Sequence, residues 1–101
     1  MIQEVAMLYI KQGKYADFEY AFERAQGLIS SRTGYISHQM QRCLETPGKY
    51  ILLVCWRCLE DHTEGFRKSK EYQEWKQCLH HFYEPFPLVE HYSTVFEGGI
   101  K

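Results

Sequence analysis

The fold follows from residues 35–58, which read YISHQMQRCLETPGKYILLVCWRC. Pro47-Gly48 is a pair favoured in type II turns, because proline presets the first central residue and glycine accepts a positive φ at the second. The flanking segments Tyr35–Leu44 and Lys49–Cys58 have matching length. The stretch therefore predicts a β-hairpin whose second strand is the more apolar.

The residues before the hairpin predict one strand and one helix. Gln3–Lys11 has apolar residues at both odd and even positions, so both faces of a strand would be apolar, which predicts a buried strand. Gly13 follows it as a turn residue. From Tyr15 to about Ser30 the apolar spacing becomes helical. The stripe consists of Phe18, Phe22, Ala25 and Ile29.

Two helical pieces and a strand are predicted after the hairpin. Asp61, with Glu64 three residues on, has the form of a capping box that starts a short helix. Ser69 can cap a second helix. The residues that share one face of this helix are Tyr72, Trp75, Leu79 and Phe82. Two prolines end it, and Leu88–Phe96 predicts a fourth strand.

The resulting order, β-α-β-β-α-β, predicts an α+β fold of the ferredoxin-like class with a four-stranded antiparallel sheet. Right-handed crossovers place the first and third strands in the centre. Two helices cover only one face of such a sheet, yet the third strand is apolar on both faces. We therefore expect a homodimer in which two sheets pack face to face, as in a dimeric α+β barrel.

Composition limits the class of protein. The chain has 101 residues, which is room for a single domain spanning 1–101, and its net charge of −1 lacks the cationic surplus of a nucleic-acid binder. The longest apolar run, Tyr50–Trp56, is the length of a strand rather than a membrane span. The N-terminus lacks the pattern of a secretory signal, so we expect a cytoplasmic protein with reduced cysteines.

Metal and RNA sites are both disfavoured. Cys55 and Cys58 form a C-x-x-C, but residues three apart in a strand point to opposite faces, so two small buried side chains are the simpler interpretation and we expect no metal. RNA-binding sheets share the element order. The third strand lacks their glycine-aromatic pattern, so we expect no nucleic-acid partner.

Histidines and aromatic residues are the candidates for a site. A neutral imidazole is a good general base near pH 7. For each of the five histidines a plain structural role competes, such as a contact with a helix dipole or with solvent. Large rings that do not fill space completely leave an apolar cavity, and a cavity with a histidine is a plausible site.

The second half of the chain carries a longer pattern. It reads Trp56, Leu59-Glu60-Asp61-His62, Gly65-Phe66-Arg67, Ser69, Tyr72, Trp75, Leu79-His80-His81-Phe82-Tyr83, Pro85-Phe86-Pro87 and Val89-Glu90-His91-Tyr92. This pattern resembles the antibiotic biosynthesis monooxygenase domain family, whose members are small bacterial dimeric α+β barrels. The resemblance covers essentially the whole chain and is strongest from Tyr35 to Tyr92.

The resemblance implies an activity. Members of the family include cofactor-independent oxygenases of quinols and aromatic polyketides, and a branch that binds and degrades haem. The Asn, Trp and His on which that branch relies would fall near Ala6, at Gly65 or Phe66, and near Lys76, and none is retained. Haem degradation is therefore not expected.

The leading hypothesis is a cytoplasmic homodimer that needs no cofactor and oxidises a small aromatic phenol or quinol with O2 in a pocket between sheet and helices. His62 or His81 is expected to act as the base. The expected substrate-binding residues are Tyr35, His38, Trp56, Phe66 and Tyr72. The alternatives are a non-catalytic dimeric module that binds an aromatic ligand or a partner protein, and a haem-binding relative.

Overall fold

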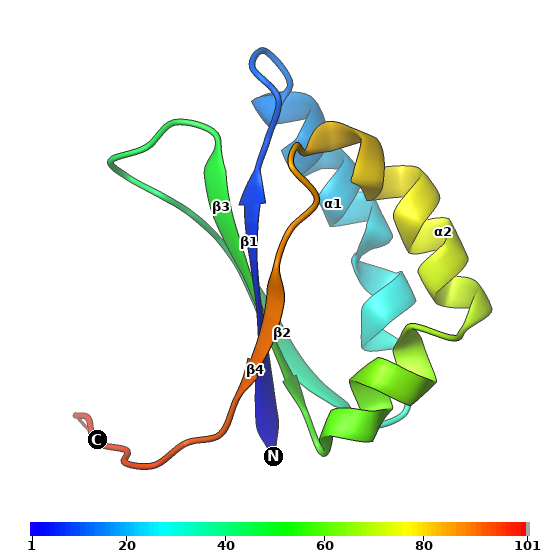
Figure 1. Cartoon of the computed structure of the whole chain (residues 1–101), viewed down its shortest axis with the longest axis vertical. Helices are drawn as coiled ribbons and strands as arrows, with labels where there is room; N and C mark the ends of the chain where they lie inside the picture. The colour runs from blue at the N-terminus through cyan, green and yellow to red at the C-terminus, as the bar shows by residue number, and fades with distance from the viewer. Residues whose placement is uncertain (101) are drawn as a thin grey trace.

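The computed structural model describes residues 1–100 and contains one antiparallel sheet in the strand order β2-β3-β1-β4 (Figure 1). The strands are β1 (Ile2–Tyr9), β2 (Tyr35–Arg42), β3 (Lys49–Trp56) and β4 (Val89–Tyr92). The prediction that the first and third strands are central is confirmed, and so is the ferredoxin-like element order.

The hairpin forms between β2 and β3 as predicted. Gly48 has φ +80°, and the amide of Lys49 donates to the carbonyl of Thr46 at 3.3 Å, which closes the turn. The strands are shorter than predicted, since β2 ends at Arg42 and β3 at Trp56. Cys58 thus lies beyond β3. The prediction that Cys55 and Cys58 lie within one strand is therefore wrong.

The fourth strand is also shorter than the predicted Leu88–Phe96. β4 pairs only with residues 3–6 of β1, so Tyr92 is the last residue with a partner in the sheet. Residues 93–100 then leave the sheet and run away from the body of the molecule (Figure 1).

Two helices cover one face of the sheet (Figure 1). α1 (Tyr15–Ser30) buries the predicted stripe of Phe18, Phe22, Ala25 and Ile29. α2 (Lys70–Leu79) begins where expected, because the Ser69 hydroxyl accepts a hydrogen bond from the amide of Tyr72 at 3.1 Å. A single 3₁₀ turn, η2 (His80–Phe82), follows α2.

The predicted capping box at Asp61 is not formed. The segment η1 (Asp61–Phe66) is a π-helical turn, and no side-chain hydrogen bond caps its start. The Asp61 carboxylate instead accepts from the Cys58 thiol at 3.3 Å and packs against Gly34, where a Cβ atom would lie 1.9 Å from Asp61 Oδ2. The carboxylate joins η1 to the turn before β2 rather than capping η1.

The core lies between the sheet and the helices. On β3, Tyr50, Leu52, Val54 and Trp56 are buried, whereas the alternate residues Ile51, Leu53 and Cys55 are only half-buried on the uncovered face. The predicted division of β3 into two faces is therefore confirmed. Among residues 1–100, no helix is both long and apolar enough to span a membrane.

Candidate active site

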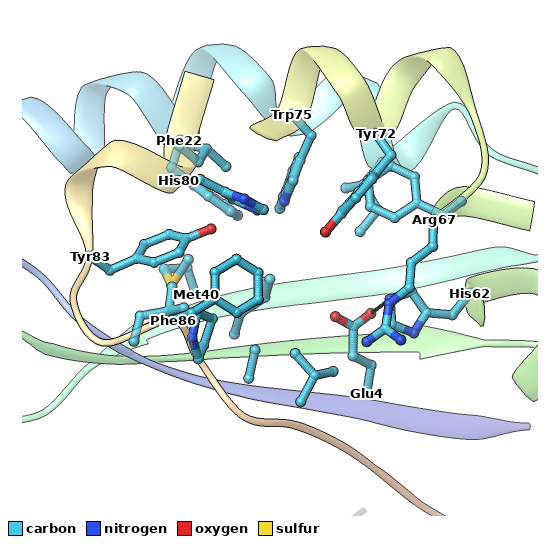
Figure 2. A pocket seen from close by; sticks show the side chains of 18 of the residues that line it. Glu4, Phe22, Met40, His62, Arg67, Tyr72, Trp75, His80, Tyr83 and Phe86 are labelled. Carbon is cyan, nitrogen blue, oxygen red and sulfur yellow. Dashed lines mark ion pairs between the residues drawn. The ribbon is translucent and has the colours of Figure 1, made fainter. Parts of the chain in front are cut away.

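A cavity of about 400 Å³ opens between the helices and the covered face of the sheet (Figure 2). Its aromatic walls are Phe18, Phe22, Phe66, Tyr72, Trp75, Tyr83 and Phe86. The sheet contributes mostly aliphatic side chains to the floor, including Ala6, Leu8 and Leu52. A space of this size and lining suits a small aromatic molecule.

Among residues 1–100, Glu4 is the one acidic residue that lines the cavity. Strand alternation turns it inward with Ala6 and Leu8, and it is only 5% exposed. The indole of Trp56 donates to Glu4 Oε1 at 3.0 Å. Burial raises the pKa of Glu4 from 4.5 to about 7, against the opposing effects of the Trp56 hydrogen bond and the Arg67 cation.

His62 lies beside Glu4 at the edge of the cavity (Figure 2). Its ring stacks on Trp56, with 5.6 Å between centroids, and its Nε2 lies 3.4 Å from Glu4 Oε1. Burial lowers the pKa of His62 to about 3, assisted by the positive charge of Arg67 and by His91. Although the two atoms lie within ion-pair distance, at neutral pH Glu4 faces an uncharged imidazole.

Arg67 supplies positive charge at the same end of the cavity. Its amide donates to the carbonyl of His62 at 3.0 Å, which closes the π-helical turn of η1 and fixes the start of the side chain. Figure 2 shows the guanidinium reaching down toward Glu4 and His62. The cation favours the ionised form of Glu4 and would also attract an anionic ligand in the cavity.

The rest of the cavity wall carries neutral polar groups, with Tyr72 on the side of Glu4 and Tyr83 on the far side (Figure 2). Figure 2 shows the hydroxyls of Tyr72 and Tyr83 pointing into the open space, with His80 between their rings. Burial raises the pKa of both tyrosines and lowers the pKa of His80, so all three are uncharged near pH 7. They can exchange hydrogen bonds with a polar substituent on a bound ring.

The structure brings together three of the residues predicted from the sequence. His62, Phe66 and Tyr72 all line the cavity. Trp56 does not line it but lies fully buried behind Glu4, which its indole holds in place. Trp56 thus contacts the carboxyl of Glu4 and not the open space of the cavity.

Tyr35 and His38 lie elsewhere. The Tyr35 hydroxyl contacts Nδ1 of His38, whose Nε2 lies 2.8 Å from the side-chain oxygen of Gln26 on α1. His38 lines a shallower depression between α1 and β2, outside the aromatic cavity. This placement does not support the prediction that the two residues bind the same ligand as Phe66.

His81 is also separate from the cavity. Its side chain is exposed and lines a surface depression together with Lys11, Lys14 and Asp17. The neighbouring His80 lines the cavity instead, because the chain changes from α2 to a 3₁₀ turn at this point. His81 is therefore not placed where it could act as the base of this site.

Sequence reasoning missed the carboxyl and the cation of the site. The sequence predicts Glu4 only as part of an apolar strand and Arg67 only as part of the family pattern, and it indicates a role for neither. One signal was available, because Glu4 lies on the same face of the strand as Ala6 and Leu8. Burying a charged side chain on such a face costs free energy, which indicates a functional role. Within residues 1–100, no three His, Cys, Asp or Glu side chains are arranged to hold a metal ion.

A family model described as antibiotic biosynthesis monooxygenase matches residues 1–77. The chain belongs to this family. A candidate antibiotic biosynthesis monooxygenase of Bordetella bronchiseptica is similar in structure at 32% identity with a TM-score of 0.90, over 94% of this chain and 97% of that one. The resemblance inferred from the second half of the sequence is thereby confirmed.

Two further proteins are similar to this chain. The uncharacterized protein YczJ of Bacillus subtilis is 57% identical over 95 residues, which are 94% of this chain and all of YczJ. SnoaB of Streptomyces nogalater, a cofactor-independent oxygenase, has a TM-score of 0.83 at 14% identity, over 95% of this chain and 94% of SnoaB. At that identity the similarity to SnoaB shows the shared fold alone.

Proposed function

We propose that the protein is a cofactor-independent cytoplasmic monooxygenase that oxidises a small phenol or quinol with O2, and that Glu4, with His62 beside it, is the base. The observation that carries this proposal is a buried carboxyl on the wall of an aromatic cavity, where burial raises its pKa to about 7. A general base works best when its pKa lies near the working pH.

The chemistry needs a base and a closed apolar space. The Glu4 carboxylate takes the phenolic proton, and the electron-rich phenolate passes an electron to O2. The cation of Arg67 stabilises the negative charge, while the aromatic walls hold the radical pair together until the carbon–oxygen bond forms. Overall, the substrate loses two hydrogen atoms, one oxygen atom of O2 enters the product and the other leaves as water. The substrate supplies all the electrons.

The relatives support this reading at the level of reaction class. SnoaB is a cofactor-independent oxygenase with the same fold, and the family as a whole is named for monooxygenation. YczJ, at 57% identity, is uncharacterized, so the substrate is inferred only from the cavity. The cavity favours one or two fused rings with a hydroxyl at the Glu4 end and a polar substituent at the Tyr83 end (Figure 2).

We also propose that the protein acts as a homodimer. Ile51 and Leu53 of β3 and Met7 of β1 lie on the sheet face that no helix covers, and Met7 is 37% exposed. A second copy can bury this face by a two-fold contact between identical sheets. The cavity lies on the other side of the sheet and would stay open to substrate.

The test is oxygen uptake by metal-stripped protein with hydroquinones and naphthol-type phenols, with denatured protein as the control for autoxidation. We expect protein-dependent uptake, and Glu4→Gln is expected to lower kcat at least about 100-fold, which is the lower range for loss of a general base. His81→Gln is the matched control and should keep wild-type turnover, since His81 lies outside the cavity.

Two results would overturn the proposal. If Glu4→Gln turned over a verified substrate at the wild-type rate, Glu4 would not be the base. If no member of the panel caused uptake, yet bound phenols quenched the fluorescence of Trp75 in the cavity wall, the non-catalytic ligand-binding module would replace the oxygenase.

A further inference from the structure

His62 contacts two partners through its two ring nitrogens. Nε2 lies 3.4 Å from Glu4 Oε1, and Nδ1 lies 2.8 Å from Nε2 of His91. His91 is on the edge strand β4, directly opposite Glu4 in the register between β1 and β4. It is half-buried, whereas Glu4 and His62 are 5% and 3% exposed. The three groups thus form a continuous line from the cavity to the edge of the sheet.

We propose that Glu4, His62 and His91 form a path for protons between the cavity and solvent, with His91 as the outer end. This inference rests on the proposed function, in which Glu4 is the base, and it assigns a role to His91, which does not line the cavity.

The path moves one proton in each direction per turnover. When the substrate ionises, the proton on Glu4 passes to Nε2 of His62, the proton on Nδ1 of His62 passes to Nε2 of His91, and His91 releases its Nδ1 proton to water. When the second oxygen atom leaves as water, the reverse transfers bring one proton back. Each imidazole changes tautomer on the way out and recovers it on the way back, so no ring has to rotate.

The surroundings keep the path uncharged at rest. Arg67 is the charged group that acts on all three members, and Tyr72 of α2 faces Glu4 as a neutral phenol. The β4 neighbours Glu90 and Tyr92 alternate to the other face of the strand and hydrogen-bond to each other at 3.2 Å. With Arg67 disfavouring a second positive charge, a proton on either imidazole is short-lived and is passed on.

The same residue types could suggest a metal site, but their geometry favours a path. Two histidines and one carboxylate bind a metal only when their donor atoms converge on one point. Here His62 presents a different ring nitrogen to each partner, and the two nitrogens lie on opposite sides of the ring. One ion cannot contact all three groups in this arrangement.

The first test reads the histidine tautomers by 15N NMR in the resting protein and needs no substrate. We expect His62 Nδ1 and His91 Nε2 to share one hydrogen-bonded proton between pH 6 and 8. His91→Gln should change the 15N signals that report the tautomer of His62, while the control His81→Gln should leave them unchanged. If His91→Gln left the His62 nitrogen shifts as in the wild type, the pair would not be coupled and the path would be refuted.

The second test measures turnover in weak and in strong buffer. His91→Gln should lower kcat at least tenfold in weak buffer with little change in KM, and added imidazole should restore the rate. A purely structural role of His91 would give a loss that imidazole does not relieve, and that result would overturn the path. If Glu4→Gln keeps the wild-type rate, the proposed base fails instead, and the NMR test still decides whether the three groups are linked.

Discussion

At the scale of single residues, the burial of Glu4 sets how stability depends on pH. Its pKa is higher in the folded protein, about 7, than the ordinary 4.5, so the folded state holds this proton more tightly. Stability from this group is fully present below about pH 4.5 and is lost as the pH rises to about 7, by roughly 3 kcal/mol in all.

Glu4→Gln removes this loss. We therefore expect the free energy of unfolding of the variant, relative to the wild type, to increase between pH 4.5 and 7 by about 3 kcal/mol and then to level off. Urea unfolding at pH 4.5, 6 and 8 measures this difference. A constant offset between the two proteins across this range would mean that Glu4 titrates normally.

Trp56→Phe tests the hydrogen bond that holds Glu4. The indole donates to Glu4 Oε1 and lowers its pKa, so its loss should raise the pKa of Glu4 further. The pH profile of kcat/KM for oxygen uptake should move upward by the same amount, because the ionised carboxylate is the active form. An unmoved profile, with the fold intact by circular dichroism, would separate Trp56 from the ionisation of Glu4.

The sequence predicted single residues of the site unevenly. The aromatic excess, the histidines and the family resemblance predict His62, Phe66 and Tyr72 as site residues, and all three line the cavity. His80 and His81 could not be separated, since the choice depends on the 3₁₀ turn that follows Leu79. Glu4 was hidden in an apolar run, because only the cavity explains why a carboxyl can be buried there.

At the scale of elements, α2 depends on its cap. The Ser69 hydroxyl accepts from the Tyr72 amide, so Ser69→Ala should cost about 1 kcal/mol of stability, and Ser69→Asp should keep most of it. Urea unfolding of both variants measures the effect. Equal loss in both would show that the position matters for something other than capping.

The spacing of apolar residues predicted whether a segment is a helix or a strand, but it did not predict the residues at which helices and strands begin and end. The apolar stripes of α1 and β3 are long enough to predict their type and their buried face. The π-helical turn η1 has no such signal, because its bond from the Arg67 amide to the His62 carbonyl depends on packing around it. The end of β4 at Tyr92 likewise has no signal in the sequence, where apolar residues continue to Phe96.

At the scale of the whole molecule, the uncovered sheet face predicts association. We expect sedimentation equilibrium at micromolar concentration to give twice the chain mass of 12.1 kDa. Leu53→Glu, at the centre of that face, should give the monomer, because it places a charge in the contact. Tyr20→Glu on the exposed side of α1 is the control and should remain dimeric, whereas a monomeric wild type would refute the homodimer.

The whole-molecule arrangement was the part best predicted from sequence. A hairpin flanked by two β-α units leaves few allowed topologies, so the strand order followed from chain connectivity. The cavity could not be predicted from chain connectivity, because its volume depends on how the aromatic rings of α1 and α2 pack above the sheet.

The most direct test of the account is the titration of the Glu4 carboxyl, followed by 13C NMR in protein labelled at the glutamate side chains and assigned with Glu4→Gln. We predict one carboxyl with a midpoint near pH 7, which is missing in the variant. A midpoint near 4.5 for Glu4 would contradict the account, since a carboxyl that titrates normally would not be the buried base that the cavity requires.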